Sequence, residues 1–245
     1  MMETQEGMRY SQVEEVTSEK WGRTFERPID AGDIAAATDI ARLYLKLNPE
    51  GLVFLYAPWP PMEGGEPRDG MRGAEFPLRD QFDYEEQWLR KYTPTDKPWI
   101  GHVNRTQDFC YQVFEGMKAN LPELWKAGRL RMIPAGDLFL ALDKKMRVGQ
   151  VPGIARIQDF YTDVQHIRAG LPRYTVAALF YACLFEQSPE GLDWTLYNDK
   201  AKYGEDLYHD KGELLEITPQ TASLVNSVIW ETVNEHPHTH MELEK

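Results

Sequence analysis

The sequence predicts an α/β protein, in which a parallel sheet is flanked by helices. Residues 34–47 place apolar side chains at helical spacing, and an Asn-Pro-Glu-Gly turn at 48–51 ends the pattern. The run "LVFLYA" (52–57) follows without alternation, which is typical of a strand covered on both faces. A second strand and helix are expected in residues 130–150. Strands that alternate with helices favour a parallel sheet.

The other elements are expected in this order. Residues 1–30 are polar and are expected to be an irregular leader, with one short strand near 13–17. Asp33 is expected to cap the first helix, and the Pro- and Gly-rich segment 58–73 predicts a long loop that is either functional or disordered. Further helices are expected at 82–92, at 105–128, from Asp137 onward, at 172–185 and at 220–236, with Thr218 or Thr221 near the start of the last one.

Length and composition indicate one ordinary globular domain over residues 1–245. Of the 245 residues, 42% are hydrophobic and 27% are charged. The net charge of −12 argues against a nucleic-acid-binding protein, because phosphate binding needs clustered Lys and Arg. We expect no cofactor and no metal site.

Neither a membrane span nor a disulfide framework is expected. The longest apolar stretch, residues 174–185, predicts a buried helix, because a membrane span needs about 20 residues. The opening residues have no apolar core and therefore no secretory signal, which leaves the localisation open. Cys110 and Cys183 form no zinc motif, and Cys183 is expected to be buried.

An aspartate stands three residues before a histidine at two places in the chain. Asp163 and His166 lie between "IQDFY" and the apolar helix, where a loop should open at the edge of a sheet. Catalytic groups collect at such edges in open α/β folds. Asp206 and His209 lie among charged residues and glycines, so that pair is expected to be a solvated turn.

The chemistry that uses a neighbouring aspartate and histidine is nucleophilic acyl transfer. A serine hydroxyl becomes nucleophilic when a histidine removes its proton, and a carboxylate holds that histidine in the right tautomer. On one loop, a two-residue gap lets the carboxylate of Asp163 fold back onto the ring of His166, with the other ring nitrogen pointing outward.

Three segments carry a resemblance to a known family. The blocks "DVQHIRAGLPRY" (163–174), "GDIAAATDIARLYLKLNPEGLVFLYAPWP" (32–60) and "LRMIPAGDLFLALDKKMRVGQVPG" (130–153) resemble the SGNH (GDSL-like) hydrolases, especially their environmental and planctomycete-type branch. The segments stand in the family's order, and the resemblance covers residues 32–192.

The resemblance implies a three-layer, flavodoxin-like SGNH fold that lacks its N-terminal strands. It implies Asp163 as the triad carboxylate and His166 as the base of a serine esterase. The substrate class that it implies is a small-molecule or carbohydrate ester, such as an acylated carbohydrate.

The nucleophile of the family has no counterpart in this chain. No Gly-Asp-Ser or Gly-Asn-Ser occurs, and none of the serines is expected on a strand-to-helix turn; they are Ser11, Ser18, Ser188, Ser223 and Ser227. Either the chain is an N-terminally truncated form of a complete enzyme, or it is a non-catalytic relative with a binding or structural role. In both cases the isolated chain is expected to be inactive.

Four other sets of residues have a functional and a structural interpretation. Trp59 is equally explained as a sugar-stacking wall and as a cap on the sheet edge, whereas Asn104 could be an oxyanion donor but fits a helix cap better. Asp137 is expected to be a helix N-cap. His236, His238 and His240 fall in a polar tail, residues 236–245, that has no second shell to hold a metal.

Overall fold

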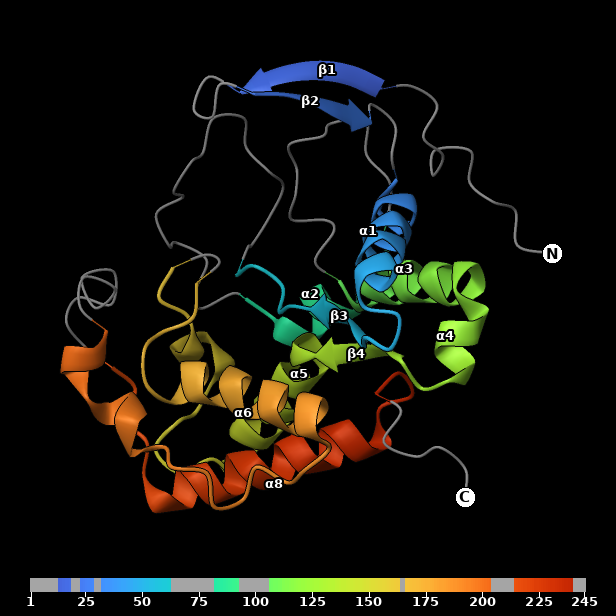
Figure 1. The fold of residues 1–245 in the computed structure, drawn as a ribbon. Coiled ribbons are helices and arrows are strands. Elements are labelled where there is room, and N and C mark those ends of the chain that lie inside the picture. Colours follow the sequence, from blue (N-terminus) through green and yellow to red (C-terminus); the bar gives the residue numbers. More distant parts are fainter. Residues whose placement is uncertain are drawn as a thin grey trace. The chain divides into compact units, whose positions relative to one another are not determined.

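The computed structural model describes residues 13–18, 23–28, 32–62, 82–92, 106–163, 166–203 and 214–239 (Figure 1). The contacts of the chain divide it into two compact units. The first unit comprises Met1–Phe54 and Tyr111–Arg131, and the second comprises Leu55–Cys110 and Met132–Lys245.

The first unit contains an antiparallel hairpin and three helices or parts of helices. The hairpin pairs β1 (Val13–Ser18) with β2 (Arg23–Pro28), so the expected strand is confirmed, but the segment around it is less irregular than expected. Helix α1 (Asp33–Leu47) begins after Gly32, so Asp33 lies in its first turn and is not the cap. A carboxylate in the first turn is stabilised by the helix dipole.

The expected helix at 105–128 is in fact two helices, α3 (Gln107–Asn120) and α4 (Pro122–Lys126). The break falls at Leu121, because proline disfavours a helical conformation in the residue before it. The hydroxyl of Thr106 accepts the N–H of Phe109 at the start of α3.

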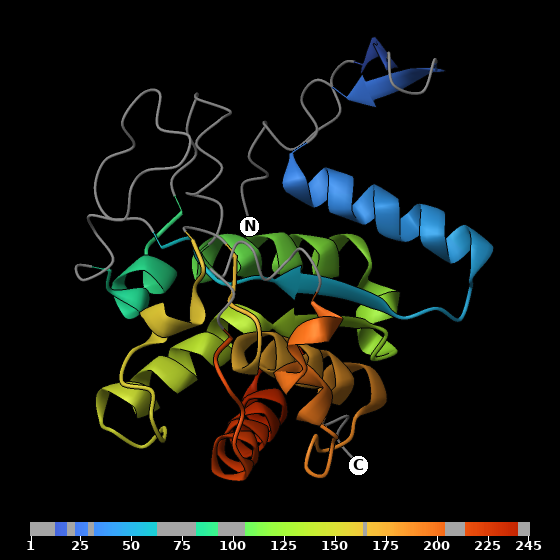
Figure 2. The same ribbon diagram turned by 90° about the vertical axis from the view of Figure 1, so that its left-hand side faces the viewer.

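A two-stranded parallel sheet, flanked by helices, is compatible with the predicted α/β class. Strands β3 (Val53–Ala57) and β4 (Leu130–Pro134) are neighbours and run in the same direction (Figure 2). Every residue of β4 is buried, Arg131 included. In β3 only Ala57 is buried and Tyr56 is exposed, so the expectation that this strand is covered on both faces is wrong.

The second unit has a helical core. Helix α8 (Pro219–Glu235) packs against α6 (Leu171–Phe185) and α5 (Ala135–Arg147), and α2 (Tyr84–Leu89) packs against α5. Short 3₁₀ turns complete the unit, namely η3 (Ile157–Phe160), η4 (Thr195–Asn198) and η5 (Lys200–Lys202).

Two helix predictions for this unit are confirmed. Cys183 is buried in α6, and Thr218 caps α8 through a reciprocal hydrogen-bond pair with Thr221. Within the described ranges, no helix has the length and apolar character that crossing a membrane requires.

Candidate functional site

The loop that carries Asp163 and His166 is closed by backbone hydrogen bonds. Tyr161 and Ile167 form an antiparallel bridge, and the N–H of Thr162 donates to the carbonyl of His166 at 2.9 Å. A further bond joins the N–H of Arg168 to the carbonyl of Phe160 at 2.8 Å. These bonds fix both ends of the loop, so the two side chains are held on one short turn.

The carboxylate of Asp163 bonds His166 twice. One oxygen, Oδ1, accepts the backbone N–H of His166 at 2.8 Å, and Oδ2 lies 2.7 Å from Nδ1 of the ring. In the neutral ring this contact favours the tautomer with the proton on Nδ1 and a lone pair on Nε2. The side chain of His166 is 76% exposed, so its outer edge faces solvent.

The base of the loop is anchored next to the carboxyl end of β3. The buried Tyr161 donates its hydroxyl hydrogen to the carbonyl of Pro60 at 2.8 Å, and Pro60 follows the strand by three residues. Tyr161 also packs edge-on against Phe82, and Phe160 packs edge-on against Phe139. The loop that carries the exposed pair is therefore joined at its base to buried aromatic side chains.

The chain after the loop is fixed by a close backbone contact at Gly170. Gly170 has φ +86°, and a Cβ built there would lie 2.1 Å from the carbonyl oxygen of Leu215. That oxygen accepts the N–H of Leu171 at 2.8 Å, and the N–H of Leu215 donates to Ala169 at 3.0 Å. Glycine is required here, and the contact sets the start of α6 directly behind the candidate site.

Trp59 is half-buried and lies against the core on one face. Its ring stacks on Phe139 with 5.2 Å between centroids and 13° between planes, and it meets Tyr56 edge-on. This contact is the one that a cap on the sheet edge makes; a sugar would have to use the opposite face of the ring.

Among the residues that the structure describes, no serine forms a hydrogen bond with His166. Ser188 accepts the N–H of Glu190 in a local turn, and Ser227 donates to Glu231 on α8. Ser223 is exposed on α8, Ser18 lies in β1, and Ser11 is outside the described residues. The residues Asn104, Asp206, His209 and His240 are outside them as well.

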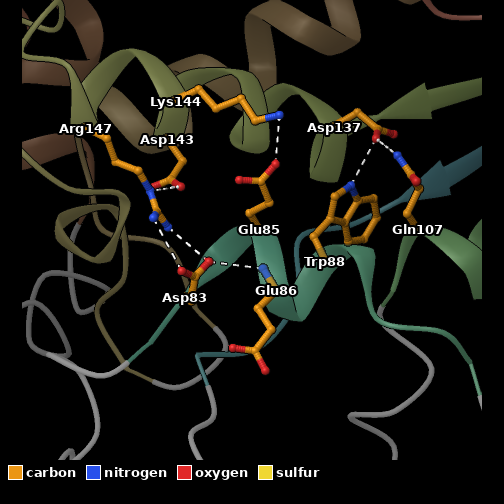
Figure 3. Close-up of polar contacts among 9 residues, drawn as sticks. All are labelled: Asp83, Glu85, Glu86, Trp88, Gln107, Asp137, Asp143, Lys144 and Arg147. Carbon is orange, nitrogen blue, oxygen red and sulfur yellow. Dashed lines mark hydrogen bonds and ion pairs between the residues drawn. The ribbon is translucent and has the colours of Figure 1, made fainter.

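A second aspartate–histidine contact, which the sequence reasoning missed, lies at the start of α5. Asp137 is not the N-cap, because the helix begins two residues earlier. Its Oδ1 accepts Trp88 Nε1 at 3.0 Å and Gln107 Nε2 at 2.6 Å (Figure 3), and its Oδ2 lies 3.3 Å from Nε2 of His236. We call these four residues the Asp137 cluster.

The Asp137 cluster is buried and satisfied. Burial raises the pKa of Asp137, but hydrogen bonds from His236, Trp88 and Gln107 outweigh it, so the pKa is lowered overall. The N–H of His238 donates to Nδ1 of His236, which leaves the proton of the neutral ring on Nε2, facing Asp137. His236 and His238 thus lie in the packed part of the protein and not in a solvated tail.

Ion pairs beside the Asp137 cluster hold α2 on α5 (Figure 3). Arg147 contacts Asp143 at 2.7 Å and Asp83 at 3.1 Å, and Lys144 contacts Glu85 at 3.0 Å. The pKa of Asp83 is lowered, mainly by the backbone N–H of Glu86, whereas burial raises the pKa of Asp143. The carboxylates of Asp83, Glu85 and Asp143 therefore have a structural role in these ion pairs.

Comparison with protein-family models gives no match, and comparisons with curated proteins and with solved structures give none either.

Proposed function

We propose that Asp163 and His166 are the carboxylate and base of a serine-hydrolase site of the SGNH type, which acts on an ester. The observation that carries this proposal is the 2.7 Å contact between Asp163 Oδ2 and His166 Nδ1, with the ring 76% exposed. His236 differs, because both of its ring nitrogens are bonded within the protein and its side chain is 5% exposed.

The proposed mechanism uses the outward nitrogen of His166. Nε2 takes the hydroxyl proton of a serine as its oxygen attacks the ester carbonyl, and the imidazolium that forms is stabilised by Asp163. The proton then passes to the departing alcohol, which leaves an acyl-serine ester. Water, deprotonated by the same nitrogen, then attacks the acyl carbon. The proton passes from His166 to the serine oxygen as its bond to that carbon breaks, and the carboxylic acid is released.

We propose that the serine lies outside the described residues, either in an N-terminal strand encoded before Met1 or unrecognised within this chain. The three-layer SGNH fold supplies such a strand, and the parallel pair β3–β4 is compatible with a part of that sheet. A carbohydrate ester is the proposed substrate class, with Trp59 and Asn104 as candidate contacts to the sugar and the oxyanion.

The alternative function is a non-catalytic SGNH-like domain with a binding or structural role. One observation favours it: among the serines that the structure describes, none bonds His166. Without a nucleophile the covalent route is lost, and only weak catalysis from binding remains. The Asp163–His166 contact would then be a relic.

We expect the 245-residue chain to show no enzymatic turnover of aryl acetates that depends on His166, as judged against its His166→Ala variant. An exposed imidazole can itself attack such esters slowly, so any His166-dependent rate should be within about tenfold of that of free imidazole. Turnover many orders of magnitude above that level, and abolished in His166→Ala, would show that a nucleophilic serine is present in the chain.

The sequence encoded upstream of Met1 separates the two functions. An in-frame Gly-Asp-Ser or Gly-Asn-Ser segment, expressed together with this chain, should give turnover that is lost in both His166→Ala and Asp163→Ala. An extended protein that has such a segment but shows no His166-dependent turnover, or the absence of any such segment, would favour the non-catalytic alternative.

A further inference from the structure

We propose that the outward face of α1 is a self-association surface, on which a second copy of the chain docks in antiparallel orientation. The inference concerns the first unit alone and is independent of the proposed hydrolase site. It starts from three large apolar side chains that repeat along one side of the helix. Ile40 is 70% exposed, Leu43 is 63% exposed and Leu47 is 78% exposed.

The opposite face of α1 is already occupied within its own unit. Thr38 and Ala41 are buried, and Asn120 of α3 donates to the hydroxyl of Thr38 at 3.3 Å. Ile34 lies so close to Gly116 that a Cβ there would be 2.4 Å from its Cδ1. The helix is therefore apolar on two sides, and the described residues cover only one of them.

The spacing of the exposed residues is that of a helix-pairing seam. With Ile40 and Leu47 at heptad position a, Leu43 stands at position d, and a and d residues form the contact in paired helices. Three such positions on a helix of about 22 Å predict a small interface, and hence a dissociation constant in the range of about 1–100 µM.

The charges beside the seam indicate that the helix that pairs with α1 is the α1 of a second copy, in antiparallel orientation. Asp39 and Lys46 both stand at position g, seven residues apart on the same flank. In an antiparallel pair, position g faces position g of the partner helix, so Asp39 of each copy meets Lys46 of the other. In a parallel pair position g faces position e, where Asp39 would meet the aromatic Tyr44.

The existing contacts of the charged residues permit this pairing. Asp39 contacts Arg42 of its own helix at 3.2 Å, an exposed pair that contributes little stability and that a carboxylate with two oxygens can share. Both copies carry a net charge of −12, which opposes association at low ionic strength. Self-association should therefore be measured at about 0.15 M salt or above, where the Debye length is about 8 Å or less.

Sedimentation velocity of the full chain tests the proposal. Wild type should form a monomer–dimer equilibrium below about 200 µM, and Leu43→Glu should weaken the dimer by at least tenfold. Val148→Glu is the matched control, because Val148 is 69% exposed but lies outside α1, and it should associate like wild type. Circular dichroism shows whether each variant is folded.

Charge exchange tests the orientation. Asp39→Lys and Lys46→Asp should each weaken self-association by about tenfold, because each places like charges across the seam. An equimolar mixture of the two variants should regain the wild-type affinity as a heterodimer. A wild type that stays monomeric, a dimer that survives Leu43→Glu, or a mixture that does not recover would each overturn the proposal.

Discussion

Replacement of Gly170 by alanine should lower the free energy of unfolding by about 3–5 kcal/mol. Two effects add. The residue has φ +86°, a conformation that costs a non-glycine residue about 1–3 kcal/mol, and its new Cβ would lie 2.1 Å from a backbone oxygen of Leu215. To relieve this clash, the backbone at Leu215 has to move. That movement breaks the hydrogen bonds that join Leu215 to Ala169 and to Leu171.

Gly153→Ala is the matched control for this prediction. Gly153 also has a positive φ, +74°, but nothing lies within 4 Å of a Cβ built there. It should therefore lose only about 1 kcal/mol, and urea unfolding followed by circular dichroism measures both variants. Equal losses in the two variants would mean that the contact between Gly170 and Leu215 is not close. An insoluble Gly170→Ala beside a soluble Gly153→Ala agrees with the prediction.

Replacement of Asp137 by alanine should cost about 3–5 kcal/mol, because it leaves three donors without an acceptor. Trp88 is fully buried and the side chain of His236 is 5% exposed, so water cannot replace the lost carboxylate freely. Asp137→Asn should cost less, about 2 kcal/mol, since one oxygen still accepts while the new amide faces the N–H of His236. Asp193→Asn should cost much less, because the bonds that Asp193 accepts from Thr195 are exposed and the amide keeps an acceptor oxygen for them.

The contribution of Asp137 should also depend on pH. Its pKa is lower in the folded protein than the ordinary value of 3.8, so its ionisation stabilises the fold above that value. The stabilisation is lost as the pH falls through the lowered pKa. The difference in unfolding free energy between wild type and Asp137→Asn should therefore be constant near neutral pH and shrink below about pH 4. A difference that grows on acidification would contradict the lowered pKa.

The regular elements were predictable because their signals are local. The apolar run at β3, the turn after α1 and the reciprocal Thr218–Thr221 cap each depend on residues within a few positions. The same is true of the contact between Asp163 and His166, where the carboxylate needs only to reach three residues along the chain. The role of that pair in catalysis stays a prediction.

The Asp137 cluster was not predictable because its members are far apart in the sequence. Asp137 and His236 are 99 residues apart, and Trp88 and Asp137 are 49 apart. One local signal did exist: a Gly-Asp pair that begins two residues after a buried strand. Gly136 leaves room for the ring of Trp88, which would lie 2.3 Å from a Cβ at that position. Because an aspartate near the start of a helix is often its N-cap, the sequence predicted that role for Asp137 and not its contacts with Trp88 and His236.

The most direct test of the catalytic interpretation is the tautomer of His166. Long-range ¹H–¹⁵N correlation spectra at about pH 8, where free imidazole is neutral, should show the proton of His166 on Nδ1. His236 provides an internal control with its proton on Nε2. In Asp163→Asn, His166 should shift toward the Nε2–H form, while His236 should not change. A proton on Nε2 of His166 in the wild type would contradict the account, because that nitrogen could then take no proton from a nucleophile.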